Sequence, residues 1–420
     1  MTIHHNAAPL AGVRVLDAAT MIAAPMTATM LADYGADVIK VELPGVGDSV
    51  RQFGGQKDGQ GLYWKALGRG KRSVALDLRT EEGKRLLIDW LAQFDVFIEN
   101  FRPGTLERWG IGPDVLHAAN PQLVILRVTA YGQDGPYREQ PGFGTLAEAL
   151  VAIPSVSGFE DRAPLLPALP LADIMAGSLG ASAVLAALRG RDESGRADVI
   201  DLAIYEAALK LMEINILEFQ QLGIEHKRQG NRYGPAAPRG SYVCRDGQWI
   251  ALSGSTQAMA RNVLFAIGGK ELVDDPRFQT NADRRDNIEA LDSLIARWCS
   301  QHDRDEALSL LNSHGCAVGP LETVPSMMSN PQIGHRGSIV TVDDPDLGPL
   351  AMTGSYPRFS SGSTAVGEPG RSEIGADTEE VLASDLGLDA DALESLRAAG
   401  AIGGPRRVLA NRGQTATPDR

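Results

Sequence analysis

The chain has 420 residues, of which 43% are hydrophobic and 22% are charged, and its formal net charge is -13. These globular values exclude disorder for most of the chain, and the length predicts two domains rather than one core. The acidic balance argues against nucleic-acid binding. The three cysteines, Cys244, Cys299 and Cys316, show neither a zinc spacing nor a disulfide framework. We therefore expect a reducing, cytoplasmic compartment, with no signal peptide and no apolar run long enough to span a membrane.

The first third of the chain alternates strand-like and helix-like segments. Short apolar, β-branched runs predict strands at 13–19, 37–43, 73–78, 95–101 and 123–131. Helices are predicted between them, including 24–36 and 80–94, and Thr80 begins the second of these. This alternation predicts an α/β fold with a mostly parallel sheet covered on both faces.

The rest of the chain changes character twice. After a Pro/Gly-rich stretch at 132–170, two long helices are predicted, at 173–190 and 197–223. The next segment contains a hairpin-like piece, "GSYVCRDGQWIALS", with Asp246-Gly247 as its turn, followed by helices such as 287–301. It predicts a smaller α+β domain. Two strand-like runs and an acidic helical pair follow. The predicted division is a large domain at 1–227, a small α+β domain at 228–334, a return to the large domain at 335–402, and a disordered tail at 403–420.

Common motifs for dinucleotide binding, metal binding and serine hydrolysis do not indicate a site. "GFGTLA" (142–147) matches G-x-G-x-x-A but does not directly follow a strand, so a Gly-rich loop before a helix explains it better than a dinucleotide site. The seven histidines show no metal-ligand spacing, and no G-x-S-x-G element is present.

Asp173, within "LPLADIMAG", is a carboxylate in an otherwise apolar run. Burial makes such a charge expensive, so the residue needs an explanation. A helix begins beside it, and capping of the first turn is the structural alternative. The same position keeps a carboxylate ionised, which is what covalent catalysis by Asp requires.

Seven motifs occur in order along nearly the whole chain, from about Pro9 to Ile402. They are "PLAGVRVLDAA…GADVIKVE", "GRGKRSVALDL", "VFIENFRPGTLERWGIG", "YGQDGPYREQPG", "LADIMAG", "VIDLAIYEA" and "RYGPAAPRGSYVCRDGQWIALS". Together they resemble the family III CoA-transferases of the CaiB/BaiF type. The resemblance implies a Rossmann-like large domain, a smaller domain, and a homodimer threaded as interlocked rings.

The resemblance also implies site residues. Asp173 would carry the chemistry as a covalent aspartyl nucleophile. The coenzyme A handle would lie against Ala23, Arg69, Lys71, Arg72, Asn100, Phe101, Arg102 and Arg108. Three of these, in "GRGKRS", place cations within four residues on a predicted loop, which suits a phosphate group, although a solvated basic turn is the alternative. Acyl-CoA and a carboxylic acid would be the substrates, with no permanently bound cofactor and no metal.

Some positions depart from the formyl-CoA:oxalate transferases of that family. Those enzymes have Gln where this chain has Ile22, a Tyr-Glu pair where it has Phe143-Gly144, and a glycine run where it has "YGPAAPRG". A larger or less polar acceptor than oxalate is therefore expected, such as a C4–C5 dicarboxylate. Glu148 and Arg239 are further candidates for the acceptor pocket.

Two other functions stay open at this point. An α-methylacyl-CoA racemase would share the fold, but its G-H-D element falls where this chain reads Gly142-Phe143-Gly144, which supplies no His as base. A non-catalytic CoA-binding protein is the other alternative, and the intact "LADIMAG" argues against it.

Overall fold

The computed structural model describes residues 8–362 and 364–407, which form two compact units. Unit 2 comprises Ala152–Leu166 and Met212–Pro331, and unit 1 comprises the rest of the described chain. Unit 1 is thus built from segments far apart in the sequence. Residues 152–166 and 212–227, which the sequence assigned to the large domain, group with unit 2.

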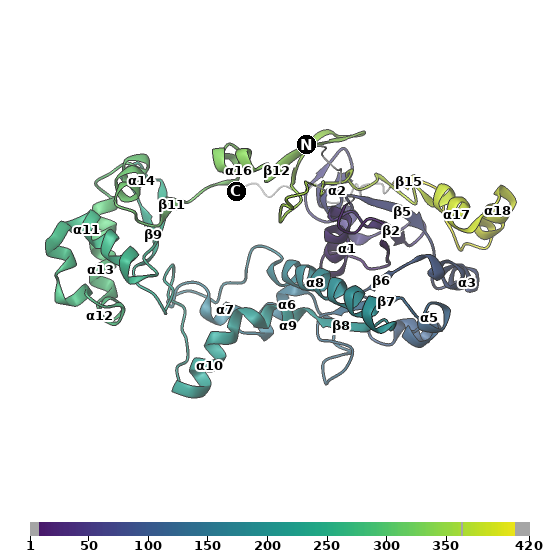
Figure 1. The fold of residues 1–420 in the computed structure, drawn as a ribbon, viewed down its shortest axis with the longest axis horizontal. Helices are drawn as coiled ribbons and strands as arrows, with labels where there is room; N and C mark the ends of the chain where they lie inside the picture. Colours follow the sequence, from purple (N-terminus) through teal and green to yellow (C-terminus); the bar gives the residue numbers. More distant parts are fainter. Residues whose placement is uncertain (1–7, 363, 408–420) are drawn as a thin grey trace. The chain divides into compact units, whose positions relative to one another are not determined.

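A six-stranded parallel sheet forms the centre of unit 1 (Figure 1). Its order is β5-β2-β1-β6-β7-β8, and every neighbouring pair is parallel. The strands are β1 Arg14–Asp17, β2 Asp37–Glu42, β5 Lys71–Ala75, β6 Val96–Glu99, β7 Val124–Thr129 and β8 Val199–Ala203. Counted along the chain, this is the 3-2-1-4-5-6 order of doubly wound folds. The predicted parallel sheet is confirmed.

The sixth strand corrects the predicted helix at 197–223. Residues Val199–Ala203 pair with β7, from Ile125↔Val199 to Thr129↔Ala203. The β-branched Val199 and Ile200 suit an extended segment, and pairing satisfies the free edge of β7. Helical structure resumes only at α9, Ile204–Leu209, and α10, Glu213–Leu222.

Helices cover both faces of the sheet. On one face, α3 (Glu81–Trp90), α5 (Pro113–Ala119), α17 (Thr378–Leu386) and α18 (Ala390–Ala398) share a hydrophobic core with the strands. Thr80 caps α3 as predicted, because its hydroxyl accepts the N–H of Gly83 at 3.0 Å. On the other face lie α1 (Ala23–Asp33) and α8 (Leu171–Ser194), which pack on each other.

Helix α8 is long and apolar enough to cross a membrane by length and composition, contrary to the expectation that no such run exists. It packs against α1, α6, α9 and strands β7 and β8. Side chains such as Val184 and Leu188 are buried in these contacts, as expected for the core helix of a globular unit.

The free edge of β5 is covered by the C-terminal part of the chain. Ser73 exchanges hydrogen bonds with Asp377, and Leu76 forms an antiparallel bridge with Ile402. Gly403 donates to the carbonyl of Ala75 at 3.1 Å. The edge therefore presents few unpaired backbone groups to other chains.

Unit 2 has a three-stranded antiparallel sheet, β11-β10-β9, packed on helices. Its elements are β9 Arg239–Val243, β10 Trp249–Ser253, α11 Gln257–Val273, α12 Asn281–Asp286, α13 Ile288–Cys299, α14 Arg304–Ser313, β11 Val318–Pro320, α15 Val324–Met328 and α7 Ile153–Val156. The predicted hairpin at 240–253 is confirmed, with Gly247 at a φ of 77° in its turn.

Shorter elements complete the described chain. They are β3 Gln56–Lys57, β4 Gln60–Gly61, α2 Leu62–Leu67, α4 Thr105–Arg108, α6 Gly144–Leu150, α16 Pro331–Arg336, β12 Ile339–Asp344, β13 Gly348–Thr353, β14 Glu373–Ile374 and β15 Arg406–Arg407. The β12–β13 hairpin matches the two strand-like runs predicted there. Disorder was expected from 403 onward, whereas 406–407 pair with β14, and 408–420 lie outside the described residues.

Candidate active site

Asp173 lies in the first turn of α8, as its third residue. The preceding cap position is Pro170, which makes no side-chain cap, so Asp173 does not act as the N-cap of its own helix. Its carboxylate accepts the backbone N–H of Gly144, the first residue of α6. A Cβ on Gly144 would stand 2.5 Å from Oδ2 of Asp173. The carboxylate therefore rests directly on the α6 backbone, which only a glycine permits in this arrangement.

Glu148 is the second carboxylate of this site. Its side chain is buried, and its Oε1 accepts the N–H of Ala172 at 3.1 Å. Helices α6 and α8 thus exchange one bond in each direction. Burial raises the pKa of Asp173 to about 6, the Glu148 charge adds to this rise, and the Gly144 N–H partly offsets it. At neutral pH, Asp173 is mainly an ionised, poorly hydrated carboxylate.

Tyr63 was missed by sequence reasoning. It lies on α2, half-buried, and its pKa is raised first by burial and then by the charge of Asp173, which places the phenol near that carboxylate. A tyrosine in an ordinary apolar helical run carries no spacing signal, so the sequence offered nothing to single it out.

The start of α1 lies one helical turn from Asp173. A Cβ on Gly177 would stand 2.7 Å from Met26 and 2.9 Å from the carbonyl of Ala23, so α1 and α8 are in close backbone contact there. The N–H groups of Ile22, Ala23 and Ala24 find no acceptor among the described residues. First-turn N–H groups left free in this way favour negative charge.

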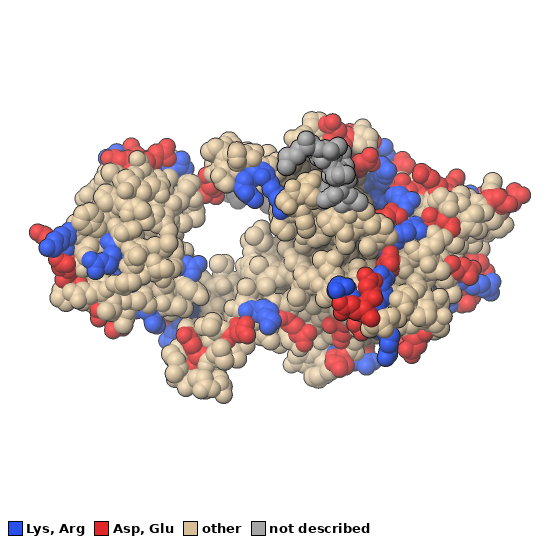
Figure 2. Space-filling model, in the orientation of Figure 1, with Lys and Arg blue, Asp and Glu red and all other residues tan. Residues whose placement is uncertain are grey.

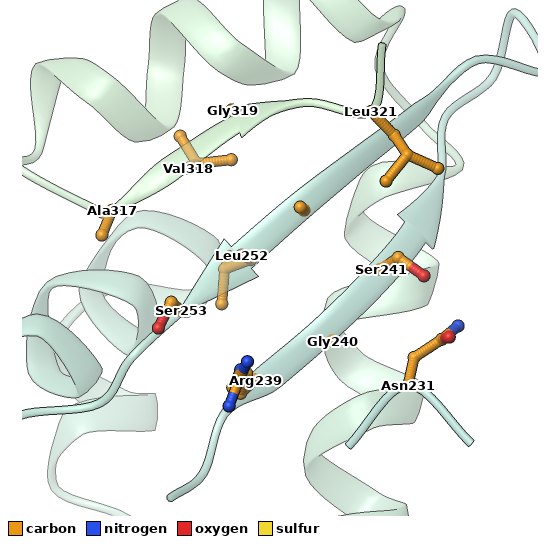
Figure 3. A pocket seen from close by; sticks show the side chains of 11 residues that line it. Asn231, Arg239, Gly240, Ser241, Leu252, Ser253, Ala317, Val318, Gly319 and Leu321 are labelled. Carbon is orange, nitrogen blue, oxygen red and sulfur yellow. The ribbon is translucent and has the colours of Figure 1, made fainter. Parts of the chain in front are cut away.

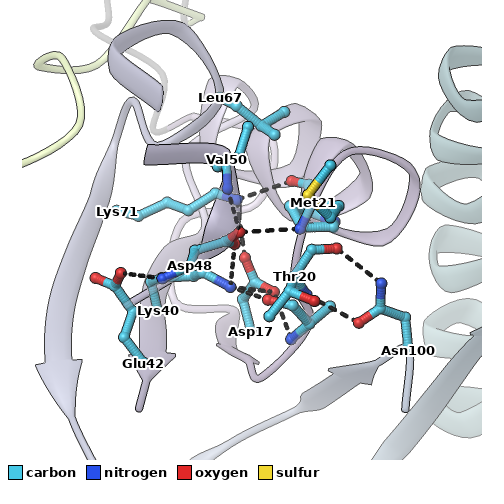
Figure 4. A network of polar contacts seen from close by, with 12 residues as sticks. Asp17, Thr20, Met21, Lys40, Glu42, Asp48, Val50, Leu67, Lys71 and Asn100 are labelled. Carbon is cyan, nitrogen blue, oxygen red and sulfur yellow. Dashed lines mark hydrogen bonds and ion pairs between the residues drawn. The ribbon is translucent and has the colours of Figure 1, made fainter. Parts of the chain in front are cut away.

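The strand order reverses between β1 and β6, because β2 and β5 are added on one side of β1 and the later strands on the other. Open α/β sheets bind ligands at such a switch point. Asn100 follows β6 and Thr20 follows β1. They are joined twice, by Thr20 N–H to Asn100 Oδ1 at 2.8 Å and by Asn100 Nδ2 to the Thr20 carbonyl at 2.7 Å (Figure 4). The predicted residue Asn100 therefore fixes the loop that leads into α1.

A buried charge network also contacts this loop (Figure 4). Asp48 accepts the N–H of Met21 at 3.0 Å, and Met21 has a φ of 68°, which is uncommon for a side chain of its size. Lys71 donates to Asp17 and to the carbonyl of Pro25, both at 2.8 Å, and Lys40 lies between Asp17 and Asp48. These contacts fix the backbone ahead of α1.

The three cations of "GRGKRS" are all paired. Arg69 is buried and holds Asp33 through two bonds of 3.0 and 2.7 Å. Lys71 belongs to the network above. Arg72 contacts both oxygens of Asp37 at 2.8 and 2.7 Å. Lys71 and Arg72 also lie in β5, not on the expected loop, because their segment pairs with β2. Their contact with a phosphate stays a prediction.

The residues after β6 are more open. The side chain of Arg102 is exposed and makes no hydrogen bond or ion pair within the described chain, and the side chain of Arg108 donates to Thr105 at 2.8 Å. Phe101 packs edge to face on Trp109 at 5.1 Å and against the core. On the face that Figure 2 shows, Lys and Arg side chains lie among those of Asp and Glu. The negative net charge of the chain therefore does not prevent local positive charge at the surface.

The residues predicted for the acceptor pocket separate into two groups. Ile22 is buried at the start of α1, next to Ala23, which was predicted to contact the coenzyme and is also buried. Phe143 is 62% exposed just ahead of α6, and Glu148 is buried as described. Arg239 belongs to unit 2. There it lies over the ring of Tyr233 at 4.4 Å and lines a hollow of about 500 Å³ on the sheet face (Figure 3). Within residues 8–362 and 364–407, no three His, Cys, Asp or Glu side chains cluster as metal ligands.

Known proteins resemble this chain along most of its length. The family model for CoA-transferase family III matches residues 10–378. Succinyl-CoA--D-citramalate CoA-transferase of Chloroflexus aurantiacus is 39% identical over 93% of this chain and 97% of its own length. The succinyl-CoA--L-malate CoA-transferase beta subunit of the same organism is 38% identical, with coverage of 93% and 97%. A crystal structure of a CaiB/BaiF family protein from Brucella suis superposes with a TM-score of 0.78 at 31% identity, covering 90% of this chain and all of that one.

Proposed function

This chain belongs to CoA-transferase family III, and we propose that it moves CoA from succinyl-CoA or a similar donor to a C4–C5 dicarboxylate through a covalent adduct on Asp173. One observation carries the proposal. Asp173 is ionised at neutral pH, poorly hydrated and held by one N–H, and no cation is among the groups that shift its pKa, so its nucleophilicity is not reduced by an ion pair.

The proposed steps balance without an added base or oxidant. A carboxylate oxygen of Asp173 attacks the thioester carbonyl, the C–S bond breaks, and a mixed anhydride and CoA thiolate form. The thiolate attacks Cγ of Asp173, releases the donor acid, and leaves an aspartyl-CoA thioester. The acceptor carboxylate then attacks Cγ, expels the CoA thiolate and forms a second mixed anhydride. The thiolate attacks the acceptor carbonyl of this anhydride and breaks its bond to the Asp173 oxygen. Acceptor-CoA leaves, and Asp173 is restored.

Each tetrahedral intermediate needs hydrogen-bond donors for its oxyanion. The N–H groups at the start of α1, on Ile22, Ala23 and Ala24, support this role because they lack acceptors among the described residues. The N–H that follows Asp173 suits the role less well, since Ile174 donates to the carbonyl of Pro170 at 3.0 Å. We therefore assign the oxyanion donors to α1.

The coenzyme handle is proposed to lie beside the loops that follow β1 and β6. Arg102 and Arg108 offer exposed positive charge for the phosphates, and Arg72 is the most open of the three "GRGKRS" cations. Arg69 and Lys71 are buried, and their ion pairs support a part in shaping the wall of the site. Phe101 and Asn100 complete that wall.

The acceptor is proposed to be longer than oxalate. Phe143 directly precedes Gly144, which contacts the Asp173 carboxylate, and its exposed ring offers apolar surface to the carbon chain of a dicarboxylate. Ile22 is buried and shapes the start of α1. D-citramalate and L-malate, the acids in the names of the two Chloroflexus relatives, are of that size.

A homodimer is part of the proposal. Helix α10 has no buried residue, and its side chains Leu217 and Phe219 are 51% and 61% exposed. An apolar surface of this kind marks a contact with another chain. Sizing in solution tests this, and a monomer at micromolar concentration contradicts it.

Trapping of the adduct tests the function. The enzyme is incubated with succinyl-CoA and then with hydroxylamine, and peptides are mapped by mass spectrometry. The expected modification is on Asp173, and Asp173→Asn serves as the matched control that forms none. A panel of dicarboxylates then identifies the acceptor. An enzyme that instead exchanges an α-proton of an acyl-CoA for solvent deuterium, without a trapped adduct, would be a racemase and would overturn the proposal.

A further inference from the structure

Helices α6 and α8 each direct one carboxylate onto a backbone N–H of the other helix. Asp173 accepts from Gly144, and Glu148 of the same α6 accepts from Ala172, the neighbour of Asp173. We propose that Glu148 is a positioning residue for the nucleophile, which fixes the first turn of α8 and uses its negative charge to favour the acylated form of Asp173 over the free carboxylate. The acylation half of this inference rests on the proposed function.

The positioning step follows from the bonding of the α8 start. Its N-terminal N–H groups need acceptors, and the cap residue Pro170 supplies no side chain for them. Glu148 fills that place at 3.1 Å, with only 2% of its surface exposed. Because Ala172 is covalently joined to Asp173, the hydrogen bond from Ala172 to Glu148 limits the movement of the backbone that carries Asp173.

The electrostatic step follows from what acylation does to charge. Free Asp173 is an anion beside a second carboxylate, and each repels the other in a place with little water. In the mixed anhydride, or in the aspartyl-CoA thioester, the Asp173 side chain is neutral and the repulsion is gone. Glu148 therefore destabilises the reactant state and not the adduct. The same repulsion makes the free carboxylate more basic and a stronger nucleophile.

Other titratable groups on the elements around this pair do not replace Glu148. On α2, Tyr63 is neutral at the working pH and Lys65 pairs with Asp344. On α1, the first turn has no acidic residue, and Asp33 at the other end pairs with Arg69. Tyr205 and Glu206 of α9 bond to each other at 3.3 Å near the surface. The charged groups of β7 and β8 are Arg127, paired with Glu99 and Glu107, and Asp201, which accepts from the backbone of Gln133.

The test uses two carboxylate-to-amide substitutions in the full-length enzyme. Glu148→Gln keeps an oxygen that can accept from Ala172 and removes only the charge. Glu193→Gln is the matched control, because Glu193 is exposed near the far end of α8 and pairs with Arg189. The first measurement is the pH dependence of adduct formation on Asp173 in a single turnover. The second is an NMR titration of the Asp173 carboxyl carbon, assigned with Asp173→Asn, which needs no catalysis.

Glu148→Gln is expected to move the acid limb of adduct formation, and the NMR midpoint, down by about 0.5 to 1 pH unit, and to lower the fraction of acylated enzyme at equilibrium several-fold. Glu193→Gln should change neither. A folded Glu148→Gln enzyme with the midpoint of the unsubstituted protein overturns the inference. If the unsubstituted enzyme forms no adduct at all, the proposed function fails, whereas the NMR midpoint still decides whether Glu148 charge acts on Asp173.

Discussion

Replacement of Gly144 by alanine should disable the nucleophile while the fold stays intact. The added Cβ would stand 2.5 Å from Oδ2, 2.7 Å from Cγ and 3.0 Å from Oδ1 of Asp173. Ordinary van der Waals contact begins at 3.4 Å, so the Asp173 carboxylate would have to move away from the added Cβ by roughly 0.9 Å. A misplacement of about 1 Å in a reacting group costs on the order of 100-fold in rate, equivalent to about 2.7 kcal/mol of barrier.

The assay is steady-state kcat and KM for CoA transfer, together with the rate of adduct formation on Asp173. We expect kcat to fall about 100-fold, with little change in the KM for acyl-CoA. Gly190→Ala is the matched control, because Gly190 lies on α8 with open space around its Cβ position. That change should preserve kcat and raise the unfolding free energy by about 0.5 to 1 kcal/mol. A Gly144→Ala enzyme with undiminished kcat would refute the reasoning.

Three further changes test other parts of the structure. Because the pKa of Asp173 is raised in the folded state, that state binds more protons than the unfolded state between about pH 4 and 6, and its free energy of unfolding falls as the pH rises through this range. Asp173→Asn removes this effect, so the variant should be inactive yet more stable at pH 7 by about 1 to 3 kcal/mol. Urea unfolding should show the gain at pH 7 and none near pH 4. Gly177→Ala forces a contact of 2.7 Å with Met26 and should cost about 1 to 3 kcal/mol; an unchanged Tm would contradict the close packing of α1 on α8. Met21→Gly removes the strain of a side chain at a φ of 68° and should raise the free energy of unfolding by about 1 kcal/mol, measured in urea. A lower free energy of unfolding would show that the contacts of the Met21 side chain outweigh the backbone strain.

The sequence predicted the large features of the fold because they follow from local patterns. Five of the six parallel strands are short apolar runs between helices, and Thr80 began its helix where expected. The segment of the sixth strand predicts a helix instead, since "VIDLAIYEAALK" is equally compatible with helical periodicity. The extended form is favoured only by its pairing with the edge of β7, which is a tertiary contact.

The site was less accessible to sequence reasoning. Asp173 stands out as a charge in an apolar run, and in the structure α1 and α6 pack beside its helix. The cations of "GRGKRS" looked free because their partners, Asp17, Asp33 and Asp37, come from earlier segments of the chain. The bond from Ala172 to Glu148 spans 24 residues and leaves no local trace in the sequence.

The covering of β5 by residues near 375 and 402 has a consequence for biosynthesis. When the ribosome has made β5, the outer edge of this strand is still bare, and about 300 residues must follow before the segment that covers it emerges. At about 5 to 20 residues per second, that delay lasts on the order of tens of seconds. Unit 2 is complete before the delay ends, so the nascent chain carries a finished domain beside an open sheet, and chaperone capture during translation should be strongest in that interval.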